Sequence, residues 1–351
     1  MRIIACFFVI FNHLPGYSLY GITDSPLKSW VYMIPTMITR INVPIFFMIS
    51  GTLLLTDKQE SYKKIIQKRF MRIIYALALF TLILYLVSIG QHQVKWSFSQ
   101  YLWYLFAEPI DIGGRAYWYL YCYLGFLLLL PILRRITKGM TKADFILLLS
   151  VHFFFSSLIP IVNIILTSHG IDNIVISPHF SEALDLALDK VMFYPLIGYY
   201  IDHSIDLKNT KPKQIILLCL FGIAGIVVSN ICTYYEGTHG DMIFTQNYVS
   251  LFDYISTICV FILIKYICLK HNGYIAHPHF VKTVTLIGSL TYGIYLIDPV
   301  LKKLVYIPFE TILEPFMITF FVSILWCLTS MIIGGLITFE LNKVSIFKKI
   351  F

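Results

Sequence analysis

The chain begins with an apolar stretch, MRIIACFFVIFNH, that carries Arg2 near one end and His13 at the other. On an α-helix the two residues are related by a rotation of about 1100° around the axis, which is three turns plus roughly 20°. Both side chains therefore lie on one face, about 16 Å apart along the axis. An ionisable group within an apolar helix is costly and by default marks a functional site. A neutral imidazole can accept a proton from a hydroxyl and return it to a leaving group.

His13 has a second interpretation. The first stretch ends close to His13, and a histidine there is equally at home where a helix meets interfacial water. The stretch alone leaves both interpretations open, so the other elements of the chain must be considered.

The composition predicts a membrane protein. Hydrophobic residues make up 58% of the 351 residues and charged residues 13%, with a mean hydropathy of +0.76. Soluble domains carry about 25% charged residues, so this chain has too few to cover a water-exposed surface. The net charge of +8 is then expected to flank membrane spans and not to form a nucleic-acid site.

Apolar segments of about 20 residues predict membrane-spanning helices. On that criterion we expect an all-α polytopic protein of about ten spans in a single domain, 1–351, with the spans at 2–22, 32–55, 70–90, 116–135, 143–165, 184–202, 214–235, 248–269, 284–304 and 309–338. Most of the 27 Lys and Arg residues fall on one set of span ends, which predicts that both termini are cytoplasmic. The loops are short, so the chemistry is expected on the spans or at their ends.

A second group of candidates is the arginine pair Arg69 and Arg72, within the basic segment KKIIQKRFMR. At i and i+3 they share a helix face. Two guanidinium groups at the cytoplasmic surface suit a phosphorylated ligand such as the nucleotide end of coenzyme A. The alternative is that the segment serves only as a positive-inside signal.

Further polar and aromatic residues lie within or near the predicted spans. Arg40 precedes the segment NVPIFFMISG, whose Ser50-Gly51 is typical of close helix packing. Trp118 opens the fourth span, where aromatic residues anchor a helix at the interface. Asp298 follows Tyr295 in the ninth span and is expected to face the bundle interior or outer water, because a carboxylate facing lipid is costly.

Metal chemistry is not indicated. His277 and His279 have a ligand-like spacing, but no third ligand lies near them in the sequence. The sequence therefore predicts no metal site and no permanently bound cofactor.

Taken together, these motifs resemble the acyltransferase-3 family of integral-membrane acyltransferases. The resemblance lies in Arg2 and His13, in VPIFFMISG at Val43–Gly51, in the RxxR pair Arg69 and Arg72, in Trp118–Leu120 and in GIYLI at Gly293–Ile297. It covers essentially the whole chain and agrees with the predicted ten spans. In one respect the chain differs, because relatives often have a histidine at the position of Asp298.

The resemblance implies O-acylation of a carbohydrate. The donor would be a cytosolic acyl-CoA, usually acetyl-CoA, and the acceptor a surface polysaccharide or lipid-linked glycan at the bacterial plasma (inner) membrane. It implies that His13 is catalytic with Arg2 as its partner, and that Arg69 and Arg72 bind the donor. It also implies that further residues line the substrate site: Arg40, Ser50, Trp118 and Tyr295.

Two questions stay open at the level of sequence. Transfer is either direct, with His13 as the base, or passes through an acyl-His13 or acyl-Ser50 relay. The alternative function is a membrane transporter or exporter of a polysaccharide or its precursor. Transporters tend to show inverted repeats and broken helices in matching halves, and we find neither in the sequence.

Overall fold

The computed structural model describes residues 1–14, 38–56, 60–107, 112–159, 162–163, 166, 171, 193–239, 251–270, 277–345 and 347–351. Within these ranges the chain forms helices and no strand, which confirms the predicted all-α class. The described residues divide into two compact units. The α11 unit is formed within Ser18–Lys58 and Ile132–Ile275, and the α15 unit within Arg2–Tyr17, Gln59–Pro131 and Ala276–Phe351.

Five stretches of helix in the described residues are long and apolar enough to cross a membrane: Tyr62–Gly90, Gly114–Gly139, Pro212–Ile231, Pro278–Leu313 and Thr319–Leu341. Only 28% to 44% of each apolar segment is buried within the protein. Many large apolar side chains on these helices are exposed, as expected for helices that are surrounded by lipid. The chain is therefore a multi-pass membrane protein, and ten spans with two cytoplasmic termini stay a prediction.

The other predicted spans are only partly described. The first two correspond to shorter apolar helices, α1 (Arg2–Asn12) and α3 (Asn42–Leu54), and residues 15–37 lie outside the described part. The predicted span 143–165 begins with α8 (Lys142–Phe153) and the π-helical η3 (Phe154–Leu158). The span 184–202 corresponds in its second half to α11 (Phe193–Ser204), and 248–269 to α13 (Leu251–Lys270).

The boundary between the last two predicted spans was wrong. Helix α15 (Pro278–Leu301) does not end near residue 304 but continues through the π-helical η5 (Lys302–Tyr306) into α16 (Ile307–Leu313). Pro308 follows directly after the π-helical turn η5, where the regular α-helical hydrogen bonding is already altered. Helix α17 starts only at Thr319.

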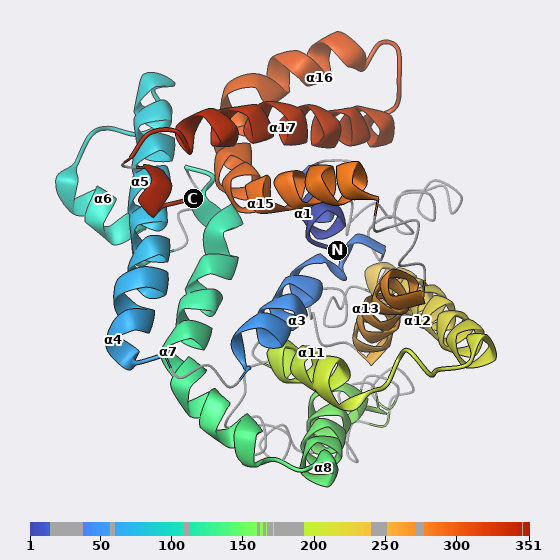
Figure 1. Cartoon of the computed structure of the whole chain (residues 1–351). Coiled ribbons are helices and arrows are strands. Elements are labelled where there is room, and N and C mark those ends of the chain that lie inside the picture. Colours follow the sequence, from blue (N-terminus) through green and yellow to red (C-terminus); the bar gives the residue numbers. More distant parts are fainter. Residues whose placement is uncertain are drawn as a thin grey trace. The chain divides into compact units, whose positions relative to one another are not determined.

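In the α15 unit, helix α15 contacts α1, α17 (Thr319–Leu341) and α5 (Met71–Gly90). Figure 1 shows α1 and α17 beside α15. Gly293 of α15 allows this close packing, because a Cβ there would lie 2.3 Å from Thr338 Cγ2 of α17. The Cys6 thiol of α1 also donates to the Thr291 carbonyl of α15 over 3.6 Å. The Cys6 contact holds α1, which leads into His13, against α15.

Smaller elements complete the α15 unit. Before α5 the chain forms a helical turn, α4 (Tyr62–Lys64), and the π-helical η1 (Ile65–Phe70). After α5 come α6 (Phe98–Tyr104), the 3-10 turn η2 (Gly114–Tyr117) and helix α7 (Trp118–Gly139), and η6 (Phe347–Lys349) follows α17. Helix α7 carries Pro131, and the boundary between the units falls directly after it.

In the α11 unit, α11 packs against α3 and α8, and α13 packs against α3 and α12 (Pro212–His239) (Figure 1). Between α11 and α12 the Asp206 carboxylate accepts hydrogen bonds from the Asn209 amide and from the backbone N–H groups of Lys208 and Asn209. The Asn209 amide above all holds the pKa of Asp206 below its ordinary value. These bonds fix the turn that leads from α11 into α12.

Helices α3 and α11 approach each other backbone to backbone. A Cβ at Gly51 would lie 1.8 Å from the Pro195 carbonyl oxygen, and one at Gly198 would lie 2.1 Å from the Met48 carbonyl oxygen. The Thr52 hydroxyl donates across this contact to the Gly198 carbonyl over 3.1 Å. Small residues drive helix association in membranes because they let backbones approach. The predicted packing role of Gly51 is confirmed.

We expect Gly198→Ala to destabilise the α11 unit by about 3 kcal/mol or more, because the added methyl group forces α3 and α11 apart. The midpoint of thermal unfolding of the detergent-solubilised protein would fall. The matched control is Gly125→Ala in α7, where a Cβ meets nothing within 4 Å. That substitution should leave the midpoint unchanged or raise it slightly. An equal fall in both variants would contradict the close α3–α11 contact.

Candidate functional site

His13 lies one residue beyond the last helical residue of α1, and its backbone N–H still bonds to the Ile10 carbonyl over 3.0 Å. Its side chain is 23% exposed. The Nδ1 atom is buried and forms no hydrogen bond with any described residue, so the exposed part of the ring is the part away from Nδ1. The imidazole therefore has one buried edge and one accessible edge.

The buried edge of His13 faces an acid. Nδ1 of His13 lies 3.8 Å from Oδ2 of Asp298, whose side chain is 3% exposed. The other carboxylate oxygen, Oδ1, accepts a hydrogen bond of 2.7 Å from the Ser330 hydroxyl of α17. The predicted interior position of Asp298 is confirmed, and Ser330 holds the carboxylate so that Oδ2 is directed towards His13.

A lysine joins the same group. The Lys302 ammonium donates a hydrogen bond to the backbone carbonyl of His13. This carbonyl lies directly after the last turn of α1, where helix carbonyls lack partners within the helix and cations are favoured. The Lys302 ammonium also interacts with the Asp298 charge. Lys302 thus anchors the segment that carries His13 and offsets the charge of Asp298.

These contacts define what the group can do. A carboxylate beside one ring nitrogen of a histidine orients the ring and stabilises the imidazolium that forms when the other nitrogen takes up a proton. The distance of 3.8 Å is longer than a hydrogen bond. Such distances are common in structures without substrate and tighten on binding. The arrangement would suit a general base with an orienting acid.

Arg2 lies away from this group. It is the first residue of α1 and is exposed, and it forms no hydrogen bond or ion pair with the described residues. His13 follows the other end of α1, about 16 Å away along the axis at 1.5 Å per residue. The structure therefore confirms the helix between them and does not bring the two side chains into contact.

The predicted donor-binding arginines have separate partners in the α15 unit. Arg69, in η1, forms an ion pair of 3.2 Å with Glu60. Arg72, in α5, donates from Nε to the Ile350 carbonyl over 2.9 Å and from a terminal nitrogen to Phe351 O. Its guanidinium also lies 5.3 Å from the centre of the Tyr292 ring.

Trp118 and Tyr295 lie in the α15 unit. Trp118 is the half-buried first residue of α7. The Tyr295 hydroxyl donates to the Ala116 carbonyl over 2.6 Å, and its ring makes an edge contact with Tyr117 at 6.1 Å. The Tyr117 hydroxyl in turn donates to the Leu296 carbonyl. Tyr295 therefore ties the start of α7 to the helix that carries Asp298.

Arg40 and Ser50 belong to the other unit. Arg40 forms an ion pair of 3.4 Å with Asp253 of α13, and both side chains are at most 5% exposed. The Ser50 hydroxyl donates to the Phe46 carbonyl one turn earlier in α3, over 2.9 Å. Both residues thus have structural partners within the α11 unit.

No group of three or more metal-ligating side chains occurs within the described residues. The rings of His277 and His279 stack with their centres 5.7 Å apart. Neither contributes to a ligand set in that part of the chain.

Sequence reasoning missed several partners of the candidate residues. Lys302, Ser330 and Asp253 were not identified, although each lies in or beside a predicted span, where a polar residue needs a partner. That rule marks such residues as candidates but does not pair them. The pairings depend on which helices are neighbours, and this is not encoded in any local pattern.

Comparison with known proteins now identifies the class of protein. Residues 1–339 match the family model Acyl_transf_3, described as an acyltransferase domain. The chain therefore belongs to the acyltransferase-3 family and is a membrane acyltransferase, and the transporter alternative is not favoured. No curated protein and no solved structure matches the chain significantly.

We expect Arg40→Ala to destabilise the protein by about 3–5 kcal/mol, because Asp253 would keep a buried charge without its ion-pair partner. The double variant Arg40→Ala/Asp253→Ala should recover much of that loss, as measured by thermal unfolding in detergent. Lys343→Ala is the control, since it removes an exposed pair with Glu340 and should have little effect. A double variant no more stable than Arg40→Ala would contradict the structural role of the pair.

Proposed function

We propose that the protein transfers an acyl group, most simply acetyl, from cytosolic acyl-CoA to a hydroxyl of a surface polysaccharide or lipid-linked glycan. The protein would act in the plasma (inner) membrane of a bacterium. The observation that carries this proposal is the His13–Asp298 pair, held inside the α15 unit of a membrane acyltransferase. The acyl-CoA donor and the carbohydrate acceptor come from the family resemblance of the sequence motifs.

In this mechanism His13 acts as general base. Nδ1 faces Asp298, so Nε2 on the accessible edge takes the proton of the acceptor hydroxyl. The hydroxyl oxygen attacks the thioester carbonyl and forms a C–O bond while the carbonyl electrons move onto oxygen. When the tetrahedral intermediate collapses, the C–S bond breaks and the thiolate leaves with the proton from the imidazolium. The products are the ester and free coenzyme A.

Asp298 and Lys302 support that step without touching the substrate. The Asp298 carboxylate stabilises the imidazolium and favours the tautomer with the proton on Nδ1. Lys302 holds the backbone of His13 in place through its carbonyl. A buried carboxylate next to a developing positive charge lowers the energy of the charged intermediate more than it would in water.

The donor would bind with its phosphates near Arg69 and Arg72, at the N-terminal end of α5. The basic segment predicts that this end faces the cytoplasm. Guanidinium groups bind phosphate through charge-assisted hydrogen bonds. The acyl thioester lies at the far end of the long, flexible pantetheine arm, so it reaches into the membrane while the phosphates stay outside. The resemblance further assigns Arg2 as the partner of His13. It assigns the lining of the substrate site to Arg40, Ser50, Trp118 and Tyr295.

We expect His13→Ala to lower the acylation rate by about 10²- to 10⁴-fold, the usual contribution of a general base. Alkali-labile acetyl esters on surface glycans would be compared in cells with the gene, without it and with the variant. Asp298→Asn, which keeps the shape of the side chain, should lose at least about tenfold while the protein remains folded. Membrane levels of each variant, measured on immunoblots, provide the control.

Normal esterification in the His13→Ala cells would refute the catalytic assignment. If deletion of the gene altered the export of the glycan but left its esters unchanged, the protein would be a transporter. If ester levels fell with deletion and with His13→Ala alike, the proposal would stand. The identity of the released acid then gives the acyl group transferred.

We expect Arg69→Gln to raise the KM for acyl-CoA about tenfold with little change in kcat, since charge-assisted bonds to a phosphate contribute to binding. The matched control is Glu60→Gln, which breaks the same ion pair and leaves the guanidinium in place. Steady-state kinetics in membrane vesicles measure both. Equal effects of the two substitutions would show that Arg69 serves only its ion pair with Glu60.

A further inference from the structure

Arg72 is held by the segment that follows α17. Nε of Arg72 donates to the Ile350 carbonyl over 2.9 Å, and Nη2 donates to Phe351 O. These two nitrogens form one edge of the guanidinium group, and such an edge binds a phosphate through two parallel hydrogen bonds. The oxygens of Ile350 and Phe351 therefore occupy the N–H groups that a phosphate would use.

The guanidinium of Arg72 has a further partner that does not belong to this segment. The Tyr292 ring of α15 lies beside it, with the ring centre 5.3 Å from Cζ of Arg72. An aromatic ring at this distance attracts the cation. Arg72 therefore keeps one of its partners when residues 347–351 move away.

The segment is short and is held by few side chains. It comprises η6 (Phe347–Lys349) and the two residues after it. Ile350 is 5% exposed, and the Phe351 ring makes an edge contact with Phe80 of α5 at 6.1 Å. The backbone N–H groups of Ile350 and Phe351 donate to the Phe347 carbonyl over 2.8 and 2.9 Å. Because these contacts involve a single helical turn, the segment can detach while the spanning helices stay folded.

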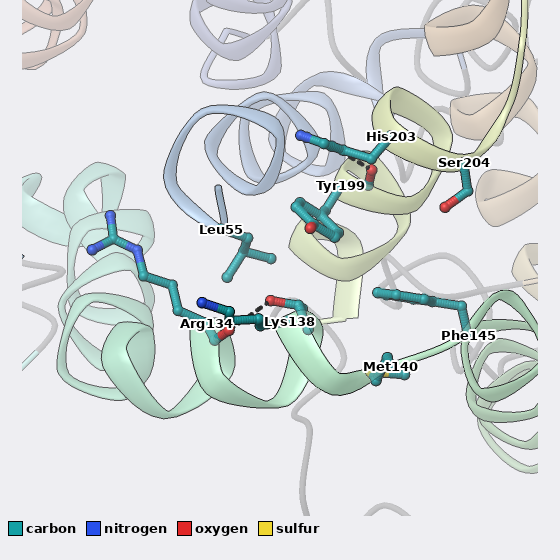
Figure 2. Close-up of a pocket in the computed structure, with 9 residues that line it drawn as sticks. Leu55, Arg134, Lys138, Met140, Phe145, Tyr199, His203 and Ser204 are labelled. Carbon is teal, nitrogen blue, oxygen red and sulfur yellow. Dashed lines mark hydrogen bonds between the residues drawn. The ribbon is translucent and has the colours of Figure 1, made fainter. Parts of the chain in front are cut away.

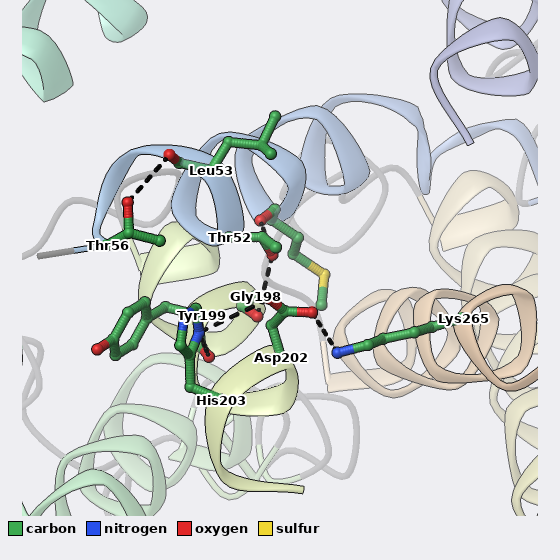
Figure 3. Close-up of polar contacts among 9 residues, drawn as sticks. Thr52, Leu53, Thr56, Gly198, Tyr199, Asp202, His203 and Lys265 are labelled. Carbon is green, nitrogen blue, oxygen red and sulfur yellow. Dashed lines mark hydrogen bonds and ion pairs between the residues drawn. The ribbon is translucent and has the colours of Figure 1, made fainter. Parts of the chain in front are cut away.

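Basic side chains at the predicted cytoplasmic end of the α11 unit are held differently. Nε of Arg134 in α7 donates to the Leu54 carbonyl of α3 over 2.6 Å, and Figure 2 shows Arg134 and Leu55 among the residues that line one pocket. Lys265 of α13 forms an ion pair with Asp202 of α11 (Figure 3). In both cases the partner belongs to a helix that packs against a second helix of the unit. Such a partner cannot leave without disrupting that packing.

From these contacts we propose that residues 347–351 form an autoinhibitory segment, which competes with a phosphate of acyl-CoA for Arg72. The proposal rests on the donor binding that the proposed function assigns to Arg69 and Arg72. While the segment is docked, one edge of the Arg72 guanidinium is occupied. The donor binds fully only when the segment has left, so its apparent affinity is reduced to the fraction of protein in the open state.

The first test measures hydrogen exchange of the full-length protein in a neutral detergent, with and without free coenzyme A. This probe needs no acyl transfer. We expect the amides of residues 347–351 to exchange about threefold faster, or more, with saturating coenzyme A, because the bound state keeps the segment open. The amides of α17 should keep their rates. Unchanged exchange in residues 347–351 while coenzyme A is bound would overturn the proposal.

The second test measures the affinity for coenzyme A by titration. The double substitution Ile350→Ser/Phe351→Ser removes the apolar side chains that hold the segment, and should raise the affinity about threefold or more. The matched control is Val344→Ser, which changes an exposed apolar residue before η6 and should alter the affinity less than about twofold. In an Arg72→Gln background the double substitution should have no effect, since the competition requires the guanidinium.

The substitution Arg69→Gln separates this proposal from the donor assignment itself. Weaker binding of coenzyme A in Arg69→Gln, with an unchanged affinity in the double Ser variant, would overturn the competition and leave the donor site in place. The same affinity in Arg69→Gln, Arg72→Gln and the unmodified protein would overturn the donor site and the competition together. A higher affinity in the double Ser variant that persists in the Arg72→Gln background would also contradict competition for Arg72.

Discussion

The burial of the Asp298 carboxylate is the constraint on which the α15 unit depends. An isolated charge moved from water into an apolar interior costs several kcal/mol even after relaxation. Here the carboxylate has the Ser330 hydroxyl, the His13 imidazole and the Lys302 ammonium around it. These groups come from three different segments, so satisfying one charge also requires α1, α15 and α17 to pack as neighbours. The same arrangement leaves the His13 imidazole with one accessible edge, on which the proposed role as a general base depends.

The α11 unit also buries charged side chains, and there they form an ion pair with each other. Arg40 and Asp253 are buried together, and their ion pair joins the residues just before α3 to α13. Between α3 and α11 the contact depends on backbone approach at Gly51 and Gly198, because apolar side chains gain no hydrophobic energy from leaving lipid. The first contact is polar and the second is steric, and both are stronger constraints in a membrane than leucine packing. These two contacts account for the polar and small residues that interrupt the apolar pattern of these helices.

Arg69 and Arg72 belong to one sequence motif, but their side chains have different contacts in the structure. The spacing of Arg69 and Arg72 predicts one shared face, yet η1 is π-helical and the two side chains have different partners. Arg69 is held by an acid, and Arg72 by backbone carbonyls and the Tyr292 ring. A phosphate would have to replace or join these partners. If Arg69 binds the donor as proposed, the strength of its ion pair with Glu60 sets part of the donor affinity.

The sequence by itself determined the class of protein and most of its helices. Apolar length and the scarcity of charge predict spanning helices wherever they occur, because a backbone in lipid must satisfy its own hydrogen bonds. The motifs around His13, Gly51, Arg69 and Trp118 also identified the family, which the match over residues 1–339 confirms. Only the tertiary structure decided which helices are neighbours, and so paired His13 with Asp298 and Arg40 with Asp253. Each of these pairs joins residues more than 200 positions apart, and a contact at that range depends on packing between helices that no local periodicity specifies.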